Sequence, residues 1–488
     1  MAQDYLDSTK FRPFLDVKHE GLVKHLCRSV YLLIESKLKE RRKRLHKDKI
    51  LIVLRVLLVN LYSAHYTHQA EYLSISRAKS AYDKSSRYSN DELSYSLVIL
   101  LLDVMEEVGL LSEQAIGFYD KRVGRGFETR VKASRSLKLL LKNHIPHSLS
   151  LIEKEHEVII LRTDKDVNDS FSNVEYEETR ETRSMRKRVI RINQALAAID
   201  LNLHLPDTEL DVLNQKLLRD PERKPIDFSR CALVRIFNNN DFKQGGRFYR
   251  GWWQEIPKQY RKYIEINGQM TAEYDFSSLH PTLIYLLEGL DPLDGAYDVD
   301  GFLHVRSLIK KAFNIMLNSS DRNSAIKAIK QKWYEIKKAE SYHGGVIDIE
   351  LMVKAIENKH YQVKHCFFTG VGLKLQRTDS EIAEQVMLEM LDEHKVVLPV
   401  HDSFIVEVFD KQLLKQTIQR VTKKLLMKEL KIDKKEEELE IINQKRLSAG
   451  EHLWSEAGAE FITREEKGDE KDYKKYFQVR DIQEGKGK

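Results

Sequence analysis

Apolar residues recur at helical spacing in the first part of the chain. Over residues 20–65 they fall on one helical face, at Leu33, Ile34, Leu38 and Leu45. A second helix is expected over 91–108, where Asp91 is the candidate cap and Gly109 occupies the position of a C-terminal cap. This pattern predicts a mostly helical N-terminal domain over residues 1–150.

Polar and apolar residues alternate over 117–132 around a Gly-rich basic turn, which predicts a β-hairpin. A helix followed by a basic hairpin resembles a winged helix-turn-helix, whose helix or wing contacts duplex DNA. An ordinary surface hairpin on a helical domain explains the same pattern. A short strand at 157–162 and a basic helix over 182–200 then predict a helical linker or thumb-like region at 151–231.

Two short apolar stretches in the second half of the chain each adjoin an aspartate. Asp275 follows an alternating stretch that begins at Met270, and Asp402 lies between Val400 and Phe404. Carboxylates on two adjacent strand ends can hold divalent cations roughly 3.5–4 Å apart, the arrangement used in phosphoryl and nucleotidyl transfer. A lone Asp on a strand is more often a turn or cap residue, so the segment between the two aspartates decides the interpretation.

The composition is that of a soluble globular protein. The chain has 488 residues, of which 42% are hydrophobic and 32% charged, and this length predicts two or three domains. The net charge is only +6, but Lys and Arg cluster in five segments, at 38–49, 121–142, 183–191, 243–263 and 306–338. Such clusters are typical of contacts to a phosphate backbone and also of solvated helix faces.

Three scattered cysteines, Cys27, Cys231 and Cys366, show neither zinc-motif spacing nor a disulfide framework, which predicts a reducing compartment. The N-terminus lacks the basic-then-apolar layout of a signal peptide. The longest apolar run, Ile50 to Leu61, is too short to span a bilayer and predicts a buried helix. We therefore expect a cytoplasmic protein with no membrane partner.

The segment from 244 to 408 resembles the family A polymerases, which include DNA polymerase I-like enzymes and phage-type single-subunit RNA polymerases. Gly245-Gly246-Arg247-Phe248 is similar to the family's Thr-Gly-Arg segment, and Trp253-Gln254-Glu255-Ile256-Pro257 is similar to its Gln-Asn-Ile-Pro segment. The resemblance covers about a third of the chain in one continuous order. It implies that Arg247, Gln254 and Arg261 bind the primer-template.

Motif A of the family is similar to Asp275-Phe276-Ser277-Ser278-Leu279-His280, and motif C is similar to Val400-His401-Asp402-Ser403. The resemblance implies that Asp275 and Asp402 bind two Mg²⁺ ions, with Mn²⁺ as an alternative, and that His401 positions the primer end or packs beneath it. His280 stands where the family screens the sugar, and its bulk favours deoxynucleotides. Ser403 instead matches the RNA polymerases, so the two motifs leave the choice between dNTPs and NTPs open.

Motif B resembles the segment from Arg306 to Asn318. Arg306 and Lys310 stand one helical turn apart, so both face one side of a helix. The resemblance implies that they grip the triphosphate and stabilise charge on the leaving pyrophosphate. Asn314 and Asn318 replace the family's aromatic and Tyr, which stack on the nascent base pair, so they bear on nucleotide selection. Alone, this segment would be a plain basic amphipathic helix.

Downstream, Gln376-Arg377-Thr378-Asp379-Ser380-Glu381-Ile382 resembles the family segment that precedes the motif C strand. The resemblance implies that Gln376 reads the primer-template minor groove, for which its paired donor and acceptor are suited. Arg377 replaces a small Gly and adds a phosphate contact.

The implied fold is α+β, a right-hand polymerase with an antiparallel palm sheet and helical fingers and thumb after the N-terminal domain. Palm and fingers would occupy 232–410, with the fingers at about 286–364, and a C-terminal helix and charged tail would occupy 411–488. The first 230 residues show no convincing acidic set of a proofreading exonuclease, so none is expected.

We therefore predict a template-directed DNA polymerase that extends a primer 3′-hydroxyl by a two-metal mechanism, with a DNA primer-template and dNTPs as partners. An RNA polymerase or primase that uses NTPs is one alternative. A catalytically degenerate, DNA-binding replication initiator is the other. The reduced size indicates, by analogy, a replication or repair enzyme of a mobile element, plasmid or phage.

Overall fold

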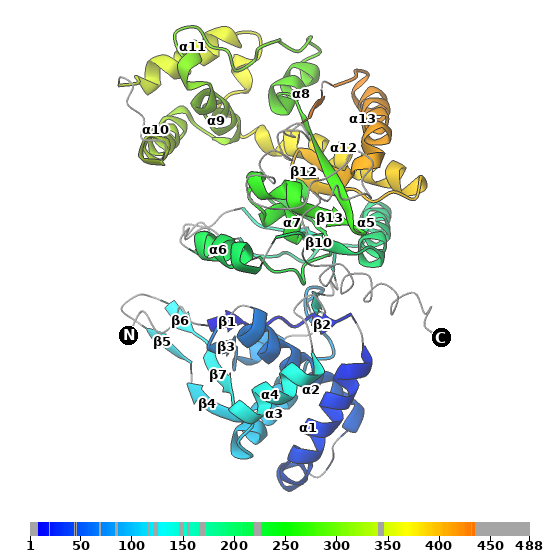
Figure 1. Cartoon of the computed structure of the whole chain (residues 1–488). Helices are drawn as coiled ribbons and strands as arrows, with labels where there is room; N and C mark the ends of the chain where they lie inside the picture. Colours follow the sequence, from blue (N-terminus) through cyan, green and yellow to red (C-terminus); the bar gives the residue numbers. More distant parts are fainter. Residues whose placement is uncertain are drawn as a thin grey trace, which may run out of the picture.

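Helices and mainly antiparallel sheets build the fold, so the chain is α+β as expected. A computed structural model describes residues 8–434 except 19, 43, 45, 68–69, 83–85, 116, 121–124, 146–150, 154–156, 165–170, 206, 219–225, 340–345 and 431. The part of the predicted charged tail beyond residue 434 lies outside these residues. An N-terminal lobe with α1 to α4 is followed by a larger part that carries the motifs (Figure 1).

The N-terminal lobe packs four helices against a four-stranded sheet around one apolar core. The helices are α1 (Glu20–Arg41), α2 (Lys47–Tyr62, continued by the π turn Ser63–Thr67), α3 (Tyr95–Glu107) and α4 (Arg135–His144). The strands, in sheet order, are β1 (Ser8–Lys10), β3 (Tyr72–Ile75), β7 (Thr129–Ala133) and β4 (Leu111–Ala115). A separate pair joins β2 (Leu15–Val17) to β8 (Leu151–Glu153).

Helix α3 begins later than the sequence pattern indicates. Its N-cap is Ser94, with extended backbone at φ −109°, and not Asp91. Its other end is as expected, because Gly109 takes φ +73° and the Leu110 N–H donates to the Met105 carbonyl at 2.8 Å. This left-handed glycine satisfies carbonyls that the last helical turn leaves open.

Two paired strands of the hairpin predicted over 117–132 are present, and its turn at 121–124 lies outside the described residues. Its strands β5 (Phe118–Asp120) and β6 (Arg125–Phe127) pair antiparallel, with Asp120 opposite Arg125. The hairpin continues from the sheet strands β4 and β7. Its role as a DNA-contacting wing stays a prediction.

Helix α2 is a core helix of the N-terminal lobe. The stretch Lys47–Thr67 has the length and hydropathy of a membrane span, but 67% of its apolar window is buried within the fold. Its buried Asn60 is fully used, because the side-chain amide donates to the Val56 and Arg12 carbonyls at 2.9 Å each and accepts from the Arg12 N–H at 2.7 Å. Core helices of soluble proteins share these properties.

Arg12 attaches the N-terminal lobe to the rest of the chain. Its guanidinium donates to Ser63 inside the lobe at 3.0 Å and to Ser229 beyond it at 2.9 Å, and it also bonds Asp227. The side chain is only about a tenth exposed. A buried arginine whose donors are used on both sides of a boundary holds the two sides in register.

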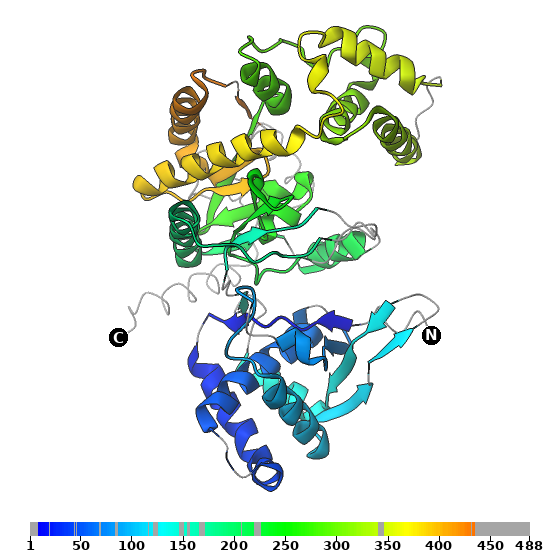
Figure 2. The same ribbon diagram turned by 180° about the vertical axis from the view of Figure 1, so that it is seen from behind.

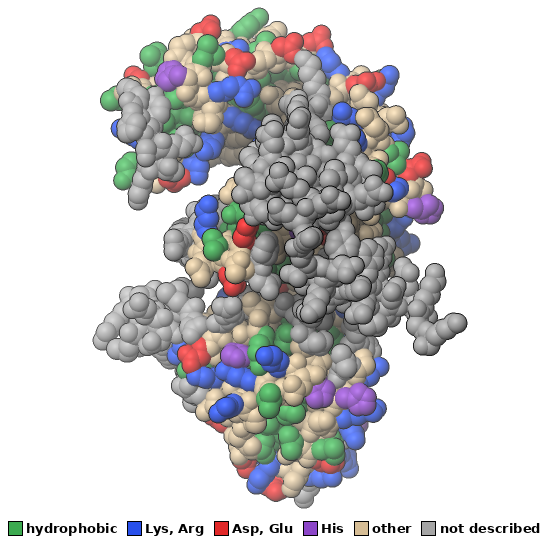
Figure 3. Space-filling view, in the orientation of Figure 1, with side chains coloured by type: hydrophobic (Ala, Val, Ile, Leu, Met, Phe, Trp, Pro, Cys, Tyr) green, Lys and Arg blue, Asp and Glu red, His purple; other side chains and the backbone are tan. Residues whose placement is uncertain are grey.

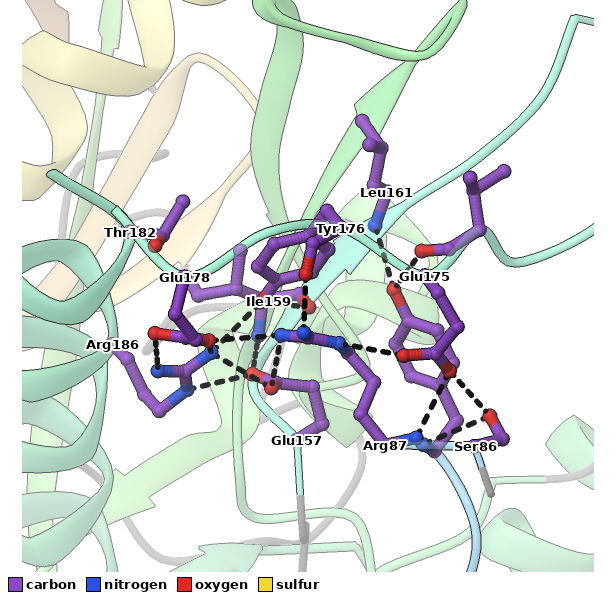
Figure 4. Close-up of polar contacts among 12 residues, drawn as sticks. Ser86, Arg87, Glu157, Ile159, Leu161, Glu175, Tyr176, Glu178, Thr182 and Arg186 are labelled. Carbon is purple, nitrogen blue, oxygen red and sulfur yellow. Dashed lines mark hydrogen bonds and ion pairs between the residues drawn. The ribbon is translucent and has the colours of Figure 1, made fainter.

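Arg87 makes a second attachment (Figure 4). Its guanidinium lies 3.6 Å from the centroid of the Tyr176 ring and binds Glu175 at 3.1 Å and Glu178 at 2.9 Å. Arg186, on α5 (Arg180–Ala198), binds the same Glu178. Arg186 also pairs with Glu157 at 2.9 Å, so two arginines and three glutamates form one cluster.

A six-stranded antiparallel sheet forms the centre of the larger part. Its path is β10 (Leu201–Leu203), β13 (Ile264–Ile266), β14 (Gln269–Phe276), β16 (Ser403–Glu407) and β15 (Leu398–Val400), with β17 (Ile432–Lys434) also beside β14. A second sheet has the order β12 (Asp241–Tyr249), β11 (Val234–Asn238) and β9 (Ile159–Leu161). Helix α6 is Asp207–Leu218.

Helix α13 (Lys411–Leu426) covers one face of the central sheet. The ammonium of Lys415 lies 5.2 Å from the centroid of the Tyr274 ring, which is buried. Side chains alternate between the two faces of a strand, so Asp275 points to the opposite face. The long helix α12 (Gly372–Asp392) runs across the molecule beside the sheets (Figure 2).

The chain between the sheet strands forms a helical lobe. It leaves β14 through α8 (Leu279–Leu287) and contains α9 (Arg306–Asn318), α10 (Arg322–Ala339) and α11 (Ile349–Lys359). The helical character predicted for 286–364 is therefore present. In the space-filling view, Lys and Arg side chains border the notch between this lobe and the middle of the molecule (Figure 3).

Candidate active site

Strand pairing brings Asp275 and Asp402 together. Asp275 on β14 stands directly opposite Ser403 on β16. Asp402 belongs to the tight turn between β15 and β16, and its carbonyl accepts from the Phe276 N–H at 3.4 Å. His401, the first turn residue, takes a φ of +55° and is exposed. Both aspartates therefore lie at the same end of two neighbouring strands.

A third carboxylate, Asp379 of α12, faces this pair. Burial raises its pKa to about 6, and repulsion from Asp402 and Asp275 adds to the rise, while Arg247 opposes it. The Arg247 guanidinium binds Asp379 at 2.6 Å. Asp402 and Asp275 therefore act electrostatically on Asp379, which connects α12 to the charge of the aspartate pair.

A hydrogen-bonded chain connects these carboxylates to the helical lobe. Arg247 donates to Nε2 of His280 at 3.1 Å, and Nδ1 of His280 lies 3.0 Å from the Asn314 carbonyl oxygen. A guanidinium only donates, so Nε2 must accept and Nδ1 must carry the proton. Burial, and then Arg247, lower the pKa of His280. His280 is therefore a neutral imidazole with one defined tautomer.

Helix α9 presents a polar stripe to the aspartates. Arg306, Lys310, Asn314 and Asn318 recur every four residues, which places them along one side of the helix. Asn314 sets the direction of this side through its bond to His280. The exposed Lys310 and Arg306 lie on the same side, one and two turns from Asn314 toward the start of α9.

Tyr297 links this stripe to the carboxylates. Its ring centroid lies 5.7 Å from the Arg306 guanidinium and 5.9 Å from the Lys310 ammonium. Burial raises the pKa of Tyr297, with Asp402 next in effect, so its hydroxyl stays protonated. The buried phenol therefore packs beside the two cations of α9 and is influenced electrostatically by the aspartates of the sheet.

Two glycines let β12 approach α12 closely and so place Arg247. Gly245 and Gly246 have φ of +75° and +81°. A Cβ on Gly246 would lie 2.6 Å from the Phe237 ring and 3.1 Å from the Ser380 hydroxyl. Only glycine fits this position without displacing its neighbours.

The fully buried Arg235 also holds β12 and α12 close together. Its guanidinium donates to the Gly246 carbonyl at 2.8 Å, to Ser380 at 3.0 Å and to Glu384 at 2.8 Å. Burial lowers the pKa of Arg235 to about 10, and the guanidinium stays charged at neutral pH. Strand β12 and helix α12 are therefore locked together directly beside Arg247.

Three residues predicted to bind the primer-template have their polar groups engaged inside the protein. Gln254 donates to the Phe248 and Pro399 carbonyls at 3.0 Å each, next to the motif C turn. Arg261 pairs with Glu273 at 3.0 Å, and Arg377 donates to the Phe242 carbonyl at 3.0 Å. These contacts give all three a positioning role, and contact with a primer-template stays a prediction.

The remaining predicted residues lie at the margin of the site. Gln376 is half-buried on α12, three residues before Asp379. The exposed Asn318 amide donates to the Asn314 carbonyl at 2.8 Å. The oxygen of Asn318 would lie 2.2 Å from a Cβ placed on Gly372, so the end of α9 and the start of α12 are in contact.

Asp379, Tyr297 and Glu273 were missed by sequence reasoning. Asp379 lies within the quoted Gln376 segment, where a carboxylate three residues from Gln376 was the available signal. Glu273 alternates with Asp275 on β14, so strand periodicity places it on the same face. Tyr297 lies in a loop, and its sequence neighbours carry no signal for its place.

The donor set suits a hard divalent cation. Asp275 and Asp402 offer carboxylate oxygens, the ligands that Mg²⁺ prefers, and Mn²⁺ accepts the same set. A bound cation would add positive charge beside these carboxylates, where Arg247 already pairs with Asp379.

A scan against protein-family models finds no match for the chain, and a search of curated proteins finds none either. The function is therefore inferred from the residues and their geometry.

Proposed function

We propose that this protein is a template-directed DNA polymerase of a right-hand type, related to family A. Residues 232–410 would form the palm, with the α9–α11 lobe as its fingers. The reaction is attack of a primer 3′-hydroxyl on the α-phosphate of a dNTP, with release of pyrophosphate. No proofreading exonuclease is included in the proposal.

One observation carries this proposal. Backbone pairing sets Asp275 and Asp402 side by side at one end of the central sheet, and the polar stripe of α9 faces them through His280 and Asn314. Paired carboxylates opposite a cationic helix suit a triphosphate, because they combine a metal-binding side with a charge-neutralising side.

Asp275 and Asp402 would hold two Mg²⁺ ions, which supply activation of the 3′-hydroxyl and neutralisation of triphosphate charge when bound. Lys310 and Arg306 lie on the exposed side of α9, where they would bind the β- and γ-phosphates. Their charges stabilise the negative charge that develops on the leaving pyrophosphate.

Arg247 and His280 would define the sugar side of the pocket. Asp379 holds Arg247, and Arg247 with Asn314 holds the imidazole of His280 in one orientation. A rigid ring at the position where the family screens the sugar leaves little room for a 2′-hydroxyl. This supports dNTPs over NTPs.

Ser403, the residue that favours ribonucleotides by resemblance, has a structural explanation. It is fully buried, and its hydroxyl donates to Glu273 at 2.6 Å, with the Val400 carbonyl oxygen 3.0 Å away as a second possible acceptor. Arg261 pairs with the same Glu273. A serine required by this hydrogen-bonded group gives no evidence about the sugar, so the preference rests on His280.

The test is extension of a labelled DNA primer-template with Mg²⁺ and either dNTPs or NTPs. The proposal expects dNTP incorporation that Asp275→Asn and Asp402→Asn each reduce at least about a thousandfold, since every 1.36 kcal/mol of lost transition-state stabilisation costs tenfold. Asp392→Asn, an exposed carboxylate at the end of α12, is the control and should keep full activity.

Each other outcome has a distinct meaning. Incorporation of NTPs alone would replace the proposal with an RNA polymerase or primase. Duplex binding that is equal in EDTA and Mg²⁺, with no incorporation by the folded protein, would contradict catalysis and leave a replication initiator. Activity that survives both aspartate variants would overturn the assignment of the site.

A further inference from the structure

Three potential metal ligands converge at the base of the helical lobe, outside the site described above. Glu288 caps the end of α8, and His365 and Cys366 belong to the short turn η7 (Lys364–Cys366) that precedes α12. One carboxylate oxygen of Glu288, Oε2, lies 3.1 Å from Nε2 of His365. The other, Oε1, lies 3.5 Å from Sγ of Cys366. One ligand atom from each residue fits within 4.8 Å of the others.

The three residues offer one oxygen, one nitrogen and one sulfur. This mixture suits a borderline-soft cation such as Zn²⁺, which is bound tetrahedrally by Cys, His and carboxylate ligands. It contrasts with the all-oxygen set of Asp275 and Asp402. Ligand chemistry therefore separates the two places, and they have no residue in common.

We propose that Glu288, His365 and Cys366 form a binding site for one Zn²⁺ ion, with a water molecule as the fourth ligand. The site does not depend on the proposed polymerase activity. Sequence spacing conceals it, because Glu288 is far from the other two ligands along the chain, and only the fold brings them together.

The position of the site suggests what the ion does. Glu288 stands where the chain enters the helical lobe, and His365 and Cys366 stand where the chain leaves it. The following residues attach to α9, because the Phe367 ring lies 5.3 Å from the Phe313 ring and the Phe368 N–H donates to the Met316 carbonyl at 2.7 Å. An ion at this point would clamp the entrance of the lobe to its exit.

The exposure of the ligands is compatible with binding from solution. Glu288 and His365 are exposed, whereas Cys366 is buried and fixed by its neighbours in the turn. Without metal the thiol proton is directed at the Glu288 carboxylate, 3.5 Å away. Binding replaces this proton, which passes to solvent, and the imidazole coordinates through Nε2 as a neutral ring.

The test uses Co²⁺ as a spectroscopic substitute for Zn²⁺ on the full chain, after treatment with a chelator. We expect one equivalent of Co²⁺ to produce a thiolate-to-cobalt charge-transfer band, which one equivalent of Zn²⁺ removes. Cys366→Ser should abolish the band. Glu288→Gln and His365→Asn change exposed side chains and should weaken Co²⁺ binding at least about tenfold.

Matched controls separate this site from the other cysteines and from the aspartate pair. Cys231→Ser removes another buried thiol and should leave the band unchanged. The Asp275→Asn, Asp402→Asn double variant should also keep it, whatever its nucleotidyl transfer activity. Zn²⁺ should slow amide hydrogen exchange at 286–288 and 364–368 in the parent chain, and not in Glu288→Gln.

Absence of the band in the folded parent chain would overturn the proposal. A band that persists in Cys366→Ser, or one that Cys231→Ser removes, would also overturn it, because another thiol would then be the ligand. If Cys366→Ser fails to fold, unchanged Co²⁺ affinity in both Glu288→Gln and His365→Asn would decide against the site.

Discussion

His280 is held from both sides by partners that fix its proton. Arg247 donates to one ring nitrogen, and the other donates to Asn314. An imidazole in a single orientation acts as a rigid wall, whereas a free side chain at this place would turn aside at little cost in energy. Sugar selection by this residue therefore depends on its two partners as much as on its size.

His280→Gly should relax the discrimination between dNTPs and NTPs. Removing the ring opens room for a 2′-hydroxyl, and we expect the ratio of kcat/KM values to change at least about tenfold, or about 1.4 kcal/mol. Steady-state incorporation of matched dNTP and NTP pairs measures this ratio. Asn314→Ala keeps the ring but removes one of its partners, so it should produce a smaller change. An unchanged ratio in His280→Gly would remove the residue from sugar selection.

Asp379 gives the site a defined pH response. Its pKa of about 6 in the fold exceeds its ordinary value of 3.8, so the folded protein binds this proton more tightly than the unfolded chain. The free energy of unfolding therefore falls as the pH rises from about 4 to 6, because the carboxyl must ionise in an environment that disfavours its charge. Asp379 is fully ionised only above this window. Below it, the carboxyl is neutral and the ion pair with Arg247 is lost.

We expect nucleotide incorporation to fall as the pH drops through about 6, because Asp379 is then protonated and no longer holds Arg247 by an ion pair. Asp379→Asn should remove this fall in kcat/KM at low pH, the acidic limb of the pH profile. Its kcat/KM should be lower and should vary less with pH. The measurement is kcat/KM between pH 5 and 8 at constant ionic strength. Asp392→Asn, on the same helix but exposed, should keep the limb. A limb of the same midpoint in Asp379→Asn would assign it to another group.

At the scale of elements, the contact between β12 and α12 depends on a glycine. Gly246→Ala would add a Cβ at 2.6 Å from Phe237 and hold an L-residue at φ +81°. Strain and overpacking together should lower the free energy of unfolding by about 2–5 kcal/mol. Gly268→Ala has a similar φ of +72° with nothing within 4 Å, so it should cost only about 1–2 kcal/mol.

Urea unfolding followed by tryptophan fluorescence can compare the two variants, because Trp252 and Trp253 are buried in this part of the molecule. The gap between Gly246→Ala and Gly268→Ala isolates the effect of close packing from that of backbone strain. Equal unfolding midpoints would show that β12 and α12 can separate at Gly246 without loss.

Local pattern predicted the elements, but not which side chains face the site. The strands that carry Asp275 and Asp402, the helix of Arg306 and Lys310 and the hairpin at 117–132 all follow from periodicity and turn residues. Asp91 precedes an apolar run, which predicts a cap there, but the N-cap of α3 is Ser94. A cap depends on where the first turn packs, which the run alone does not specify.

The inward contacts of Gln254, Arg261 and Arg377 also lay beyond sequence reasoning. Their partners are the Pro399 carbonyl, Glu273 and the Phe242 carbonyl, all distant along the chain. A long polar side chain has the same local pattern whether it binds a ligand or its own backbone. Only the tertiary arrangement distinguishes the two, and the same holds for Tyr297.

At the scale of the whole molecule, the Arg87 cluster controls how the N-terminal lobe is attached. The hydrogen bond from Arg186 is the largest cause that lowers the pKa of Glu178 from its ordinary value of 4.5 to about 2. Ionised Glu178 therefore stabilises the fold at pH values above 4.5, and this stabilisation is lost as the pH falls towards 2. The attachment should therefore persist through mild acid. Arg87→Ala removes ion pairs with three glutamates, Glu157, Glu175 and Glu178, and the contact with the Tyr176 ring.

We expect Arg87→Ala to raise amide hydrogen exchange at least about tenfold at 157–161 and 174–178, because hydrogen bonds to charged groups contribute about 1.5–3 kcal/mol each. Arg77→Ala is the matched control, since Arg77 pairs with Asp103 inside the N-terminal lobe. Exchange should not change at these segments in that variant. Equal exchange in both variants would show that Arg87 does not stabilise these two segments.

The pairing of Asp275 with Ser403 also has a consequence for the order of folding. These two strands are joined through the whole helical lobe, and the entropy cost of closing such a loop grows with its length, by about 0.6 kcal/mol for each doubling. If the lobe closes first, contacts such as that between Glu288 and His365 bring the two ends of its chain together. A folded lobe shortens the effective loop between β14 and β16. Asp275 and Asp402 would then come together among the last steps, so a nascent or partly folded chain would not yet possess the pair.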